Sequence, residues 1–161
     1  MSRWIATACG IGYIKPAAGT WGSGAALPLF WIIDNFLGLF GIIFFICLIF
    51  YLGWKAAEVY SKETKTHDAS EIVIDEVIGQ FVALLPITLC AYLFKEPPGN
   101  LWIGWLCAFL LFRVFDILKP GIIGHFDKDN TALSIILDDV FAGLFAAIGV
   151  CAILGVCVGI Q

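Results

Sequence analysis

Residues 112–143 read FRVFDILKPGIIGHFDKDNTALSIILDDVFAG, and this stretch mixes apolar runs with charged side chains. It holds five aspartates and three cations, in a chain that is 61% hydrophobic. These charged residues are Asp116, Asp127, Asp129, Asp138, Asp139, Arg113, Lys119 and Lys128. Because a lone buried charge is very costly, charges beside apolar runs must be solvated or paired. The stretch therefore predicts an acidic, cation-binding site at a membrane surface.

The composition is typical of an integral membrane protein. The 161 residues have room for one domain, and we expect residues 1–161 to form a single integral-membrane domain. Mean hydropathy is +0.96 and charged residues make up only 14% of the chain. The net charge of −4 gives no basic footprint, so nucleic acid is not an expected partner. None of the six cysteines forms a CxxC motif, which favours small buried hydrophobes over a metal site or a disulfide framework.

Four segments are long and apolar enough to cross a bilayer, which takes about 20 residues of helix. They are residues 36–54, 77–94, 101–118 and 140–160. A fifth run, residues 20–33, would make only about 21 Å of helix. Two interpretations are open: a helix that enters only half of the membrane, and a tilted helix. We therefore expect an all-α polytopic membrane protein with about four transmembrane helices plus a short N-terminal membrane helix.

The placement of Lys and Arg predicts the orientation of these spans. Residues 1–19 hold two such cations, the loop 55–70 holds three and the loop 119–133 holds two. The turns near residues 34 and 97 hold none and one. Because cytoplasmic loops carry an excess of Lys and Arg, residues 1–19 and the loops 55–70 and 119–133 are expected in the cytoplasm. The charged motifs then gather on that same side of the membrane.

Two acidic doublets, Asp75-Glu76 and Asp138-Asp139, each stand where a predicted span begins. Acidic residues favour a helix N-terminus, so simple capping is one explanation. With Asp116 on the same membrane face, the alternative is a metal site, because crowded carboxylates need a cation to relieve their repulsion. Adjacent helical residues point about 100° apart, so one member of each doublet is expected to face the ion. An all-oxygen set without histidine suits Mg²⁺ or Mn²⁺ better than zinc.

Arg113, Asp116 and Lys119 recur at intervals of three residues, which places them near one helical face. They can form ion pairs with one another along the helix, which would make charged residues tolerable where the helix leaves the membrane. Alternatively, Asp116 faces the metal while Arg113 and Lys119 hold a phosphate.

Residues 15–24 read KPAAGTWGSG, a turn rich in Gly, Ser and Thr that opens a helix. Backbone N–H groups at such a start can cradle a phosphate, and Lys15, Thr20 and Ser23 lie within it. The stretch is not a Walker motif, because the Gly-Lys-Ser/Thr ending is missing. A plain helix cap is the alternative.

Together these motifs resemble the phosphatidylglycerophosphatase A family, in the family's order and over residues 10 to 145. The matching segments are PAAGTWGS at 16–23, IVIDEVIG at 72–79, FRVFDILKP at 112–120 and DDVFAG at 138–143. Where many family members carry glycines before the paired aspartates, this chain has Asn130 to Ser134, whose Thr131 and Ser134 hydroxyls can substitute.

The resemblance implies a Mg²⁺-dependent lipid phosphatase in the bacterial inner membrane, with its active site facing the cytoplasm. It would convert the phospholipid phosphatidylglycerophosphate to phosphatidylglycerol and inorganic phosphate, in phospholipid biosynthesis. The expected catalytic and metal residues are Asp75, Glu76, Asp116, Asp138 and Asp139. The expected substrate-binding residues are Lys15, Thr20, Ser23, Arg113 and Lys119.

Two other classes stay open on the sequence. A CDP-alcohol phosphatidyltransferase also uses aspartates and Mg²⁺ at the membrane edge, but its DGxxAR…GxxxDxxxD pattern is absent here. A cation transporter or channel would want acidic residues near the membrane midplane, lining a path.

The orientation can be tested with single cysteines placed in a cysteine-free background. We expect cysteines in residues 1–19, 55–75 and 119–138 to react only with reagent that reaches the cytoplasm. Cysteines near residues 34 and 97 should react with reagent added outside, because the positively charged loops are the ones retained in the cytoplasm. Strong labelling of position 128 from the periplasm would contradict the orientation.

Overall fold

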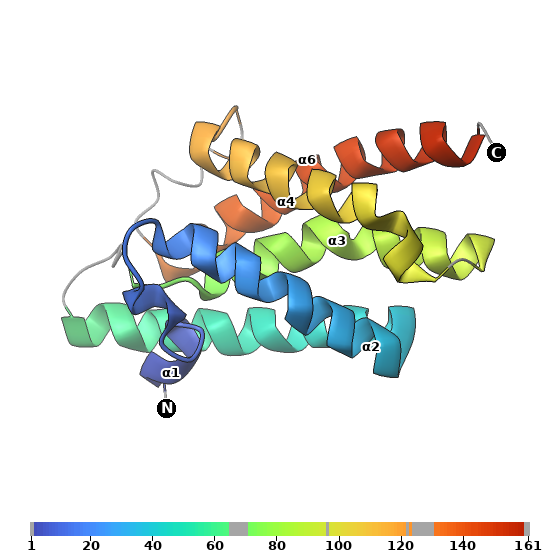
Figure 1. The fold of residues 1–161 in the computed structure, drawn as a ribbon. Helices are drawn as coiled ribbons and strands as arrows, with labels where there is room; N and C mark the ends of the chain where they lie inside the picture. The colour runs from blue at the N-terminus through green and yellow to red at the C-terminus, as the bar shows by residue number, and fades with distance from the viewer. Residues whose placement is uncertain (1, 65–70, 96, 122, 124–130, 160–161) are drawn as a thin grey trace.

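The computed structural model describes residues 2–64, 71–95, 97–121, 123 and 131–159, and within these ranges it contains helices and no strand (Figure 1). The elements are α1 (Ser2–Ala6), η1 (Ile11–Tyr13), α2 (Ala18–Thr64), α3 (Ile74–Phe94), η2 (Pro98–Leu101), α4 (Trp102–Leu118) and α6 (Ala132–Gly159). Four helices of this set are long and apolar enough to cross a membrane. The predicted all-α membrane architecture is confirmed.

The longest helix, α2, reverses direction at Gly38, so that it forms a hairpin of two arms (Figure 1). Gly38 has φ 59° and ψ −160°, a conformation that glycine adopts without a steric penalty. The predicted run of residues 20–33 ends at the polar pair Asp34-Asn35, but the helix continues through both residues, and the Asn35 amide donates to the Trp31 carbonyl at 2.7 Å. The first arm is therefore longer than the expected 20–33 segment, and residues 18–37 make about 30 Å of helix.

The central helix is α3, with 13 of its 21 residues buried. Both arms of α2, together with α4 and α6, pack around it. Phe81 of α3 meets Phe30 of the first α2 arm edge to face, with ring centroids 5.1 Å apart, and Phe45 of the second arm at 5.3 Å. Many large apolar side chains on the outside of the bundle stay exposed, as a helix surface that faces lipid requires.

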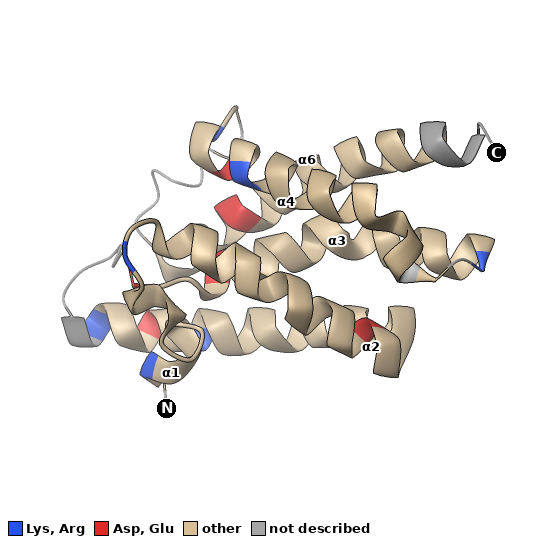
Figure 2. Cartoon of the chain, in the orientation of Figure 1, with Lys and Arg blue, Asp and Glu red and all other residues tan. Residues whose placement is uncertain are grey.

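Most of the charged residues gather at one end of the bundle (Figure 2). Asp75 and Glu76 lie in the first turn of α3. Helix α6 begins at Ala132, eight residues before the predicted span, so Asp138 and Asp139 lie inside the helix rather than at its start. The bundle therefore carries these four acidic residues on helix backbone, where their positions are fixed.

Helices α3 and α6 cross with their backbones in contact at Gly79 and Gly143. A Cβ atom on Gly143 would overlap the Gly79 carbonyl oxygen and lie 3.1 Å from Val82 Cβ. A Cβ atom on Gly79 would lie 2.5 Å from the Asp139 carbonyl oxygen. Small residues allow such close approach between membrane helices. The crossing sets the depth of α6 against α3, and so the level of Asp139 beside the first turn of α3.

The crossing predicts that Gly143→Ala lowers the thermal unfolding midpoint of the protein in detergent. The added methyl group has to push α6 away from α3, and overpacking of this kind costs about 1–3 kcal/mol. Gly155→Ala is the matched control on the same helix, because no atom lies within 4 Å of a Cβ there. The control should leave the midpoint unchanged or raise it, since Ala favours helix. Equal midpoints for the two variants would contradict the contact.

Candidate active site

Three carboxylates meet at the charged end of the bundle. Asp75 and Glu76 come from α3 and Asp139 comes from α6, and one carboxylate oxygen of each lies within 4.8 Å of the other two. Asp75 and Asp139 are only 7% and 4% exposed. Carboxylates this close in an apolar surrounding repel one another unless a cation or a proton lies between them. We call these three residues the acidic cluster.

The acidic cluster has the donors and the dimensions of a site for a hard divalent cation. All three side chains offer oxygen, which such cations prefer. Ligand oxygens that each lie about 2.0–2.6 Å from one ion are at most about 5 Å apart, which the cluster satisfies. Glu76 Oε2 is buried and has no hydrogen-bond partner within the part of the chain that the structure describes. A buried carboxylate oxygen without a donor fits a metal ligand.

The other two acidic residues that the sequence singled out lie beside the cluster, each paired with a cation. Asp116 forms an ion pair with Arg113, one turn earlier on α4. Asp138 Oδ2 accepts from Lys119 Nζ at 2.7 Å, which joins α6 to the end of α4. Asp116 also interacts electrostatically with Glu76 and Asp139 across the bundle, and Asp138 interacts with Asp75 and Asp139. The two aspartates therefore surround the acidic cluster, and Asp139 rather than Asp138 is the doublet member within it.

Arg113 connects the acidic cluster with the start of α2. Its Nη1 donates to Ser23 Oγ at 3.4 Å, while its Nε is buried without a partner among the described residues. A Cβ atom on Gly19 would overlap Glu76 Oε1 and lie 3.3 Å from Arg113 Nη1. Helix α2 can begin against the cluster because residue 19 has no side chain.

The three substrate-binding candidates near the start of α2 fall in different places. Ser23 is completely buried, and its hydroxyl also donates to the Gly19 carbonyl at 2.8 Å. Lys15 and Thr20 are both exposed, Lys15 in the turn before α2 and Thr20 in its first turn. The structure thus brings Ser23 to Arg113 and leaves Lys15 and Thr20 on the surface.

Thr131 and Ser134, which precede the second acidic doublet, hydrogen-bond to each other. Ser134 N–H donates to Thr131 Oγ1 at 3.0 Å, and Thr131 N–H donates to Ser134 Oγ at 3.1 Å. This reciprocal pattern is a capping box that starts α6. The two hydroxyls therefore stabilise the helix that carries Asp139. Asp127 and Lys128, from the same charged stretch, lie outside the described residues.

Three glycines contribute to the site, and their roles had not been assigned from the sequence. Gly19 admits Glu76 and Arg113 to the start of α2, while Gly79 and Gly143 let α3 and α6 approach. Each lies inside one of the charged motifs, four residues after an acidic residue in the case of Gly79 and Gly143. That spacing was the available signal, because residues four apart share a helix face.

Comparison with known proteins gives one consistent result. The family model for Phosphatidylglycerophosphatase A matches residues 4–154. The Haemophilus influenzae phosphatidylglycerophosphatase A is 39% identical over 150 residues, covering 92% of this chain and 86% of that protein. The Escherichia coli phosphatidylglycerophosphatase A is 34% identical over 149 residues, covering 89% of this chain and 77% of that protein.

A Bacteroides thetaiotaomicron protein with the name "Putative phosphatidylinositol-3-phosphatase" is 30% identical over 152 residues, covering 89% of this chain and 87% of that protein. No solved structure gives a significant match. The family model and the bacterial relatives cover the membrane helices, the acidic cluster and its neighbouring cations together. The chain therefore belongs to the phosphatidylglycerophosphatase A family and is a phosphoric monoester hydrolase of a membrane.

Proposed function

We propose that the protein is a Mg²⁺-dependent lipid phosphatase that converts phosphatidylglycerophosphate to phosphatidylglycerol and inorganic phosphate. The observation that carries the proposal is the acidic cluster of Asp75, Glu76 and Asp139, with Arg113 beside it, at one end of a membrane bundle. This pairing of oxygen ligands with a guanidinium suits a metal-assisted reaction of a phosphate ester. The position at the end of the helices suits a substrate whose acyl chains stay in the bilayer.

The names of the relatives support the choice of substrate. The Haemophilus and Escherichia relatives carry the phosphatidylglycerophosphatase name and are more similar than the Bacteroides relative, whose name points to a phosphoinositide. Both kinds of lipid carry a phosphate monoester on a polyol headgroup. We favour phosphatidylglycerophosphate and keep the phosphoinositide as the second candidate.

We place the acidic end of the bundle at the cytoplasmic face of the bacterial inner membrane. The positive charges of the loops support this orientation, because Lys and Arg are in excess on the cytoplasmic side. The bacterial origin of the relatives supports the membrane. The headgroup would then enter the site from the cytoplasmic leaflet.

Asp75, Glu76 and Asp139 would hold Mg²⁺ through their carboxylate oxygens. When bound, the ion would neutralise phosphate oxygens and lower the pKa of an attacking water. The nucleophile is either that water or a carboxylate that forms an aspartyl-phosphate. In the first route the carboxylates would orient the water toward the phosphate, whereas in the second one carboxylate would displace the alcohol and water would then release the phosphate. In both routes the buried surrounding strengthens each charge interaction.

Arg113 and Lys119 would stabilise the charge of the phosphate oxygens. The planar guanidinium of Arg113 can donate two parallel hydrogen bonds, and its Nε has no partner among the residues described. Lys119 keeps 30% of its side chain exposed, so its ammonium can reach a headgroup while Asp138 holds it. In this assignment Asp116 positions Arg113 and Asp138 positions Lys119, whereas Ser23 supports Arg113 from α2. Lys15 and Thr20 remain candidates for contacts with the outer part of the headgroup.

The proposal is tested by phosphate release from purified protein in detergent, with phosphatidylglycerophosphate or phosphatidylinositol 3-phosphate as substrate. We expect Mg²⁺-dependent release from the first lipid, and loss of release with a chelator. Asp139→Asn should lower the rate by about 100-fold or more, because it removes a charged ligand at nearly constant shape. Asp34→Asn is the control, since Asp34 is a buried carboxylate in α2 that interacts with Thr88, and Thr88 lies 12 residues, or about 18 Å, along α3 from Glu76. Release that survives chelation, or equal losses in both variants, would refute the assignment.

The roles of Asp138 and Lys119 predict a shared phenotype. Lys119→Ala should lower kcat/KM by about 10- to 100-fold without moving the Mg²⁺ midpoint, because it removes a charge that acts on the phosphate. Asp138→Asn should lower kcat/KM by a similar factor, because Lys119 loses the carboxylate that positions it. The double variant should lose little more than either single variant, because residues in one ion pair are not additive. The measurement is a Mg²⁺ titration of phosphate release for the three variants.

Asp116→Asn is the comparison within this experiment. Because Asp116 interacts with Glu76 and Asp139, its loss should weaken Mg²⁺ binding and raise the Mg²⁺ midpoint. Added Mg²⁺ should therefore partly restore the rate. If Asp138→Asn shifts the Mg²⁺ midpoint more than Asp116→Asn does, Asp138 belongs among the metal ligands. If Lys119→Ala is fully active, Lys119 is only a charge at the end of α4.

A further inference from the structure

Gln80 is a completely buried amide, and the described residues offer it no hydrogen-bond partner. Its exposed fraction is 0%, and neither Nε2 nor Oε1 finds a partner among the described residues. A buried polar group left unpaired costs about 1–3 kcal/mol, so it needs an explanation in a folded protein. In Gln80 both the amide donor and the amide acceptor lack a partner among the described residues. A single bound group that can both accept and donate a hydrogen bond could satisfy the two atoms together.

The position of Gln80 on α3 directs it toward the acidic cluster. It follows Glu76 by four residues, so the two share a helix face and Gln80 lies about 6 Å deeper along the axis. Glu76 on this face meets the start of α2 and Arg113. Farther along, Ile87 on the same face lies 3.4 Å from a Cβ built on Gly104 of α4. Because side chains lean toward the helix N-terminus, the Gln80 amide leans back toward the level of Glu76.

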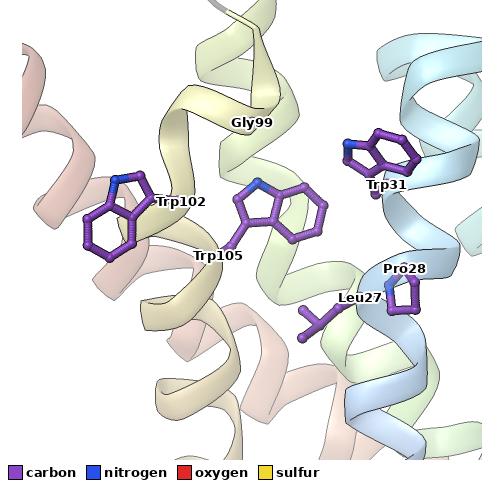
Figure 3. A pocket seen from close by; sticks show the side chains of 6 residues that line it. All are labelled: Leu27, Pro28, Trp31, Gly99, Trp102 and Trp105. Atoms are coloured by element: carbon purple, nitrogen blue, oxygen red, sulfur yellow. The ribbon is translucent and has the colours of Figure 1, made fainter.

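The seam between the first arm of α2 and helix α4 ends in an apolar pocket of about 330 Å³ (Figure 3). Its lining residues come from α2, η2 and α4, and they are Leu27, Pro28, Trp31, Gly99, Trp102 and Trp105. Trp105 precedes Arg113 by eight residues, which is about 12 Å along the helix. Charged groups, an uncharged amide and an apolar pocket thus follow one another from one end of the bundle to the other.

The first two groups in this order match the part of the proposed substrate that lies nearest the scissile phosphate. In phosphatidylglycerophosphate the phosphate monoester is followed by a glycerol whose middle carbon bears a free hydroxyl, and a phosphodiester then joins this glycerol to the diacylglycerol with its acyl chains. A hydroxyl is both a donor and an acceptor, and so is the amide of Gln80. A neutral amide suits this uncharged oxygen, whereas Arg113 and Lys119 supply the positive charge for the phosphate.

Building on the proposed function, we propose that Gln80 is a specificity-determining residue that hydrogen-bonds the free hydroxyl next to the phosphate that is removed. A lipid phosphate without this hydroxyl would leave the buried amide unpaired in the bound state. A site built to bond a hydroxyl rejects the analogue that lacks it, because its own polar groups then stay unsatisfied. The enzyme thereby prefers polyol phosphates over phosphatidate, whose phosphate sits directly on the diacylglycerol.

The test uses the full-length protein in detergent with Mg²⁺ and two substrates that differ by one oxygen. One is phosphatidylglycerophosphate, and the other is its deoxy analogue with a propane-1,3-diol headgroup. Wild type should favour the hydroxylated lipid by about 10- to 100-fold in kcat/KM. Gln80→Met, of similar length, should lower kcat/KM for that lipid to the level of the analogue and leave the analogue unchanged.

Thr88→Val is the matched control, because Thr88 is another buried polar residue of α3, eight residues farther from Glu76 than Gln80, where it interacts with Asp34 of α2. This control should keep the wild-type preference. Equal loss on both substrates in Gln80→Met would overturn the proposal, since it assigns Gln80 to helix packing or to the acidic cluster. If Gln80→Met fails to fold, the wild-type preference decides, and equal kcat/KM for the two lipids overturns the proposal. No release by wild type from either lipid would instead refute the proposed function, and the role of Gln80 with it.

Discussion

The repulsion among Asp75, Glu76 and Asp139 is the constraint on which this structure depends. Three carboxylates within 4.8 Å of one another, two of them more than 90% buried, cannot all be charged without a compensating cation. The helices nevertheless hold them together, because the Gly79–Gly143 contact and the wider packing of α6 on α3 outweigh the repulsion. A divalent cation between these oxygens would relieve the repulsion, which is why the geometry of the cluster suits such an ion.

The ion pairs around the acidic cluster follow from the same constraint. Arg113 and Lys119 neutralise Asp116 and Asp138, so of the five acidic residues predicted for the site, the three of the cluster are the ones without an ion pair among the described residues. Both cations come from α4, whose last turns lie beside α6 and the start of α2. Helix α4 therefore places positive side chains around the acidic cluster, while α3 and α6 place negative side chains within it. Cations beside a carboxylate cluster suit the binding of a phosphate together with a metal ion.

The three function classes that the sequence allowed are separated by the site and the relatives. A transporter would line a path with acidic residues near the membrane midplane, whereas the acidic cluster lies at one end of the bundle (Figure 2). The family match covers residues 4–154 and identifies a phosphoric monoester hydrolase, which leaves the phosphatidyltransferase without support. The buried Gln80 then raises the narrower question of which lipid phosphates the hydrolase accepts.

The sequence by itself determined the membrane class, the helical spans and the set of acidic and basic residues at one membrane face, because length, hydropathy and charge act locally. It misplaced the break in α2 at Asp34-Asn35 and the start of α6 at residue 140, since polar residues at a membrane edge need not end a helix. Only the tertiary structure decided that Asp139 joins the cluster while Asp138 pairs with Lys119. Adjacent residues point about 100° apart on a helix, so that choice depends on how α6 is rotated against α3. The glycine contact between distant segments fixes this rotation, and no local pattern records it.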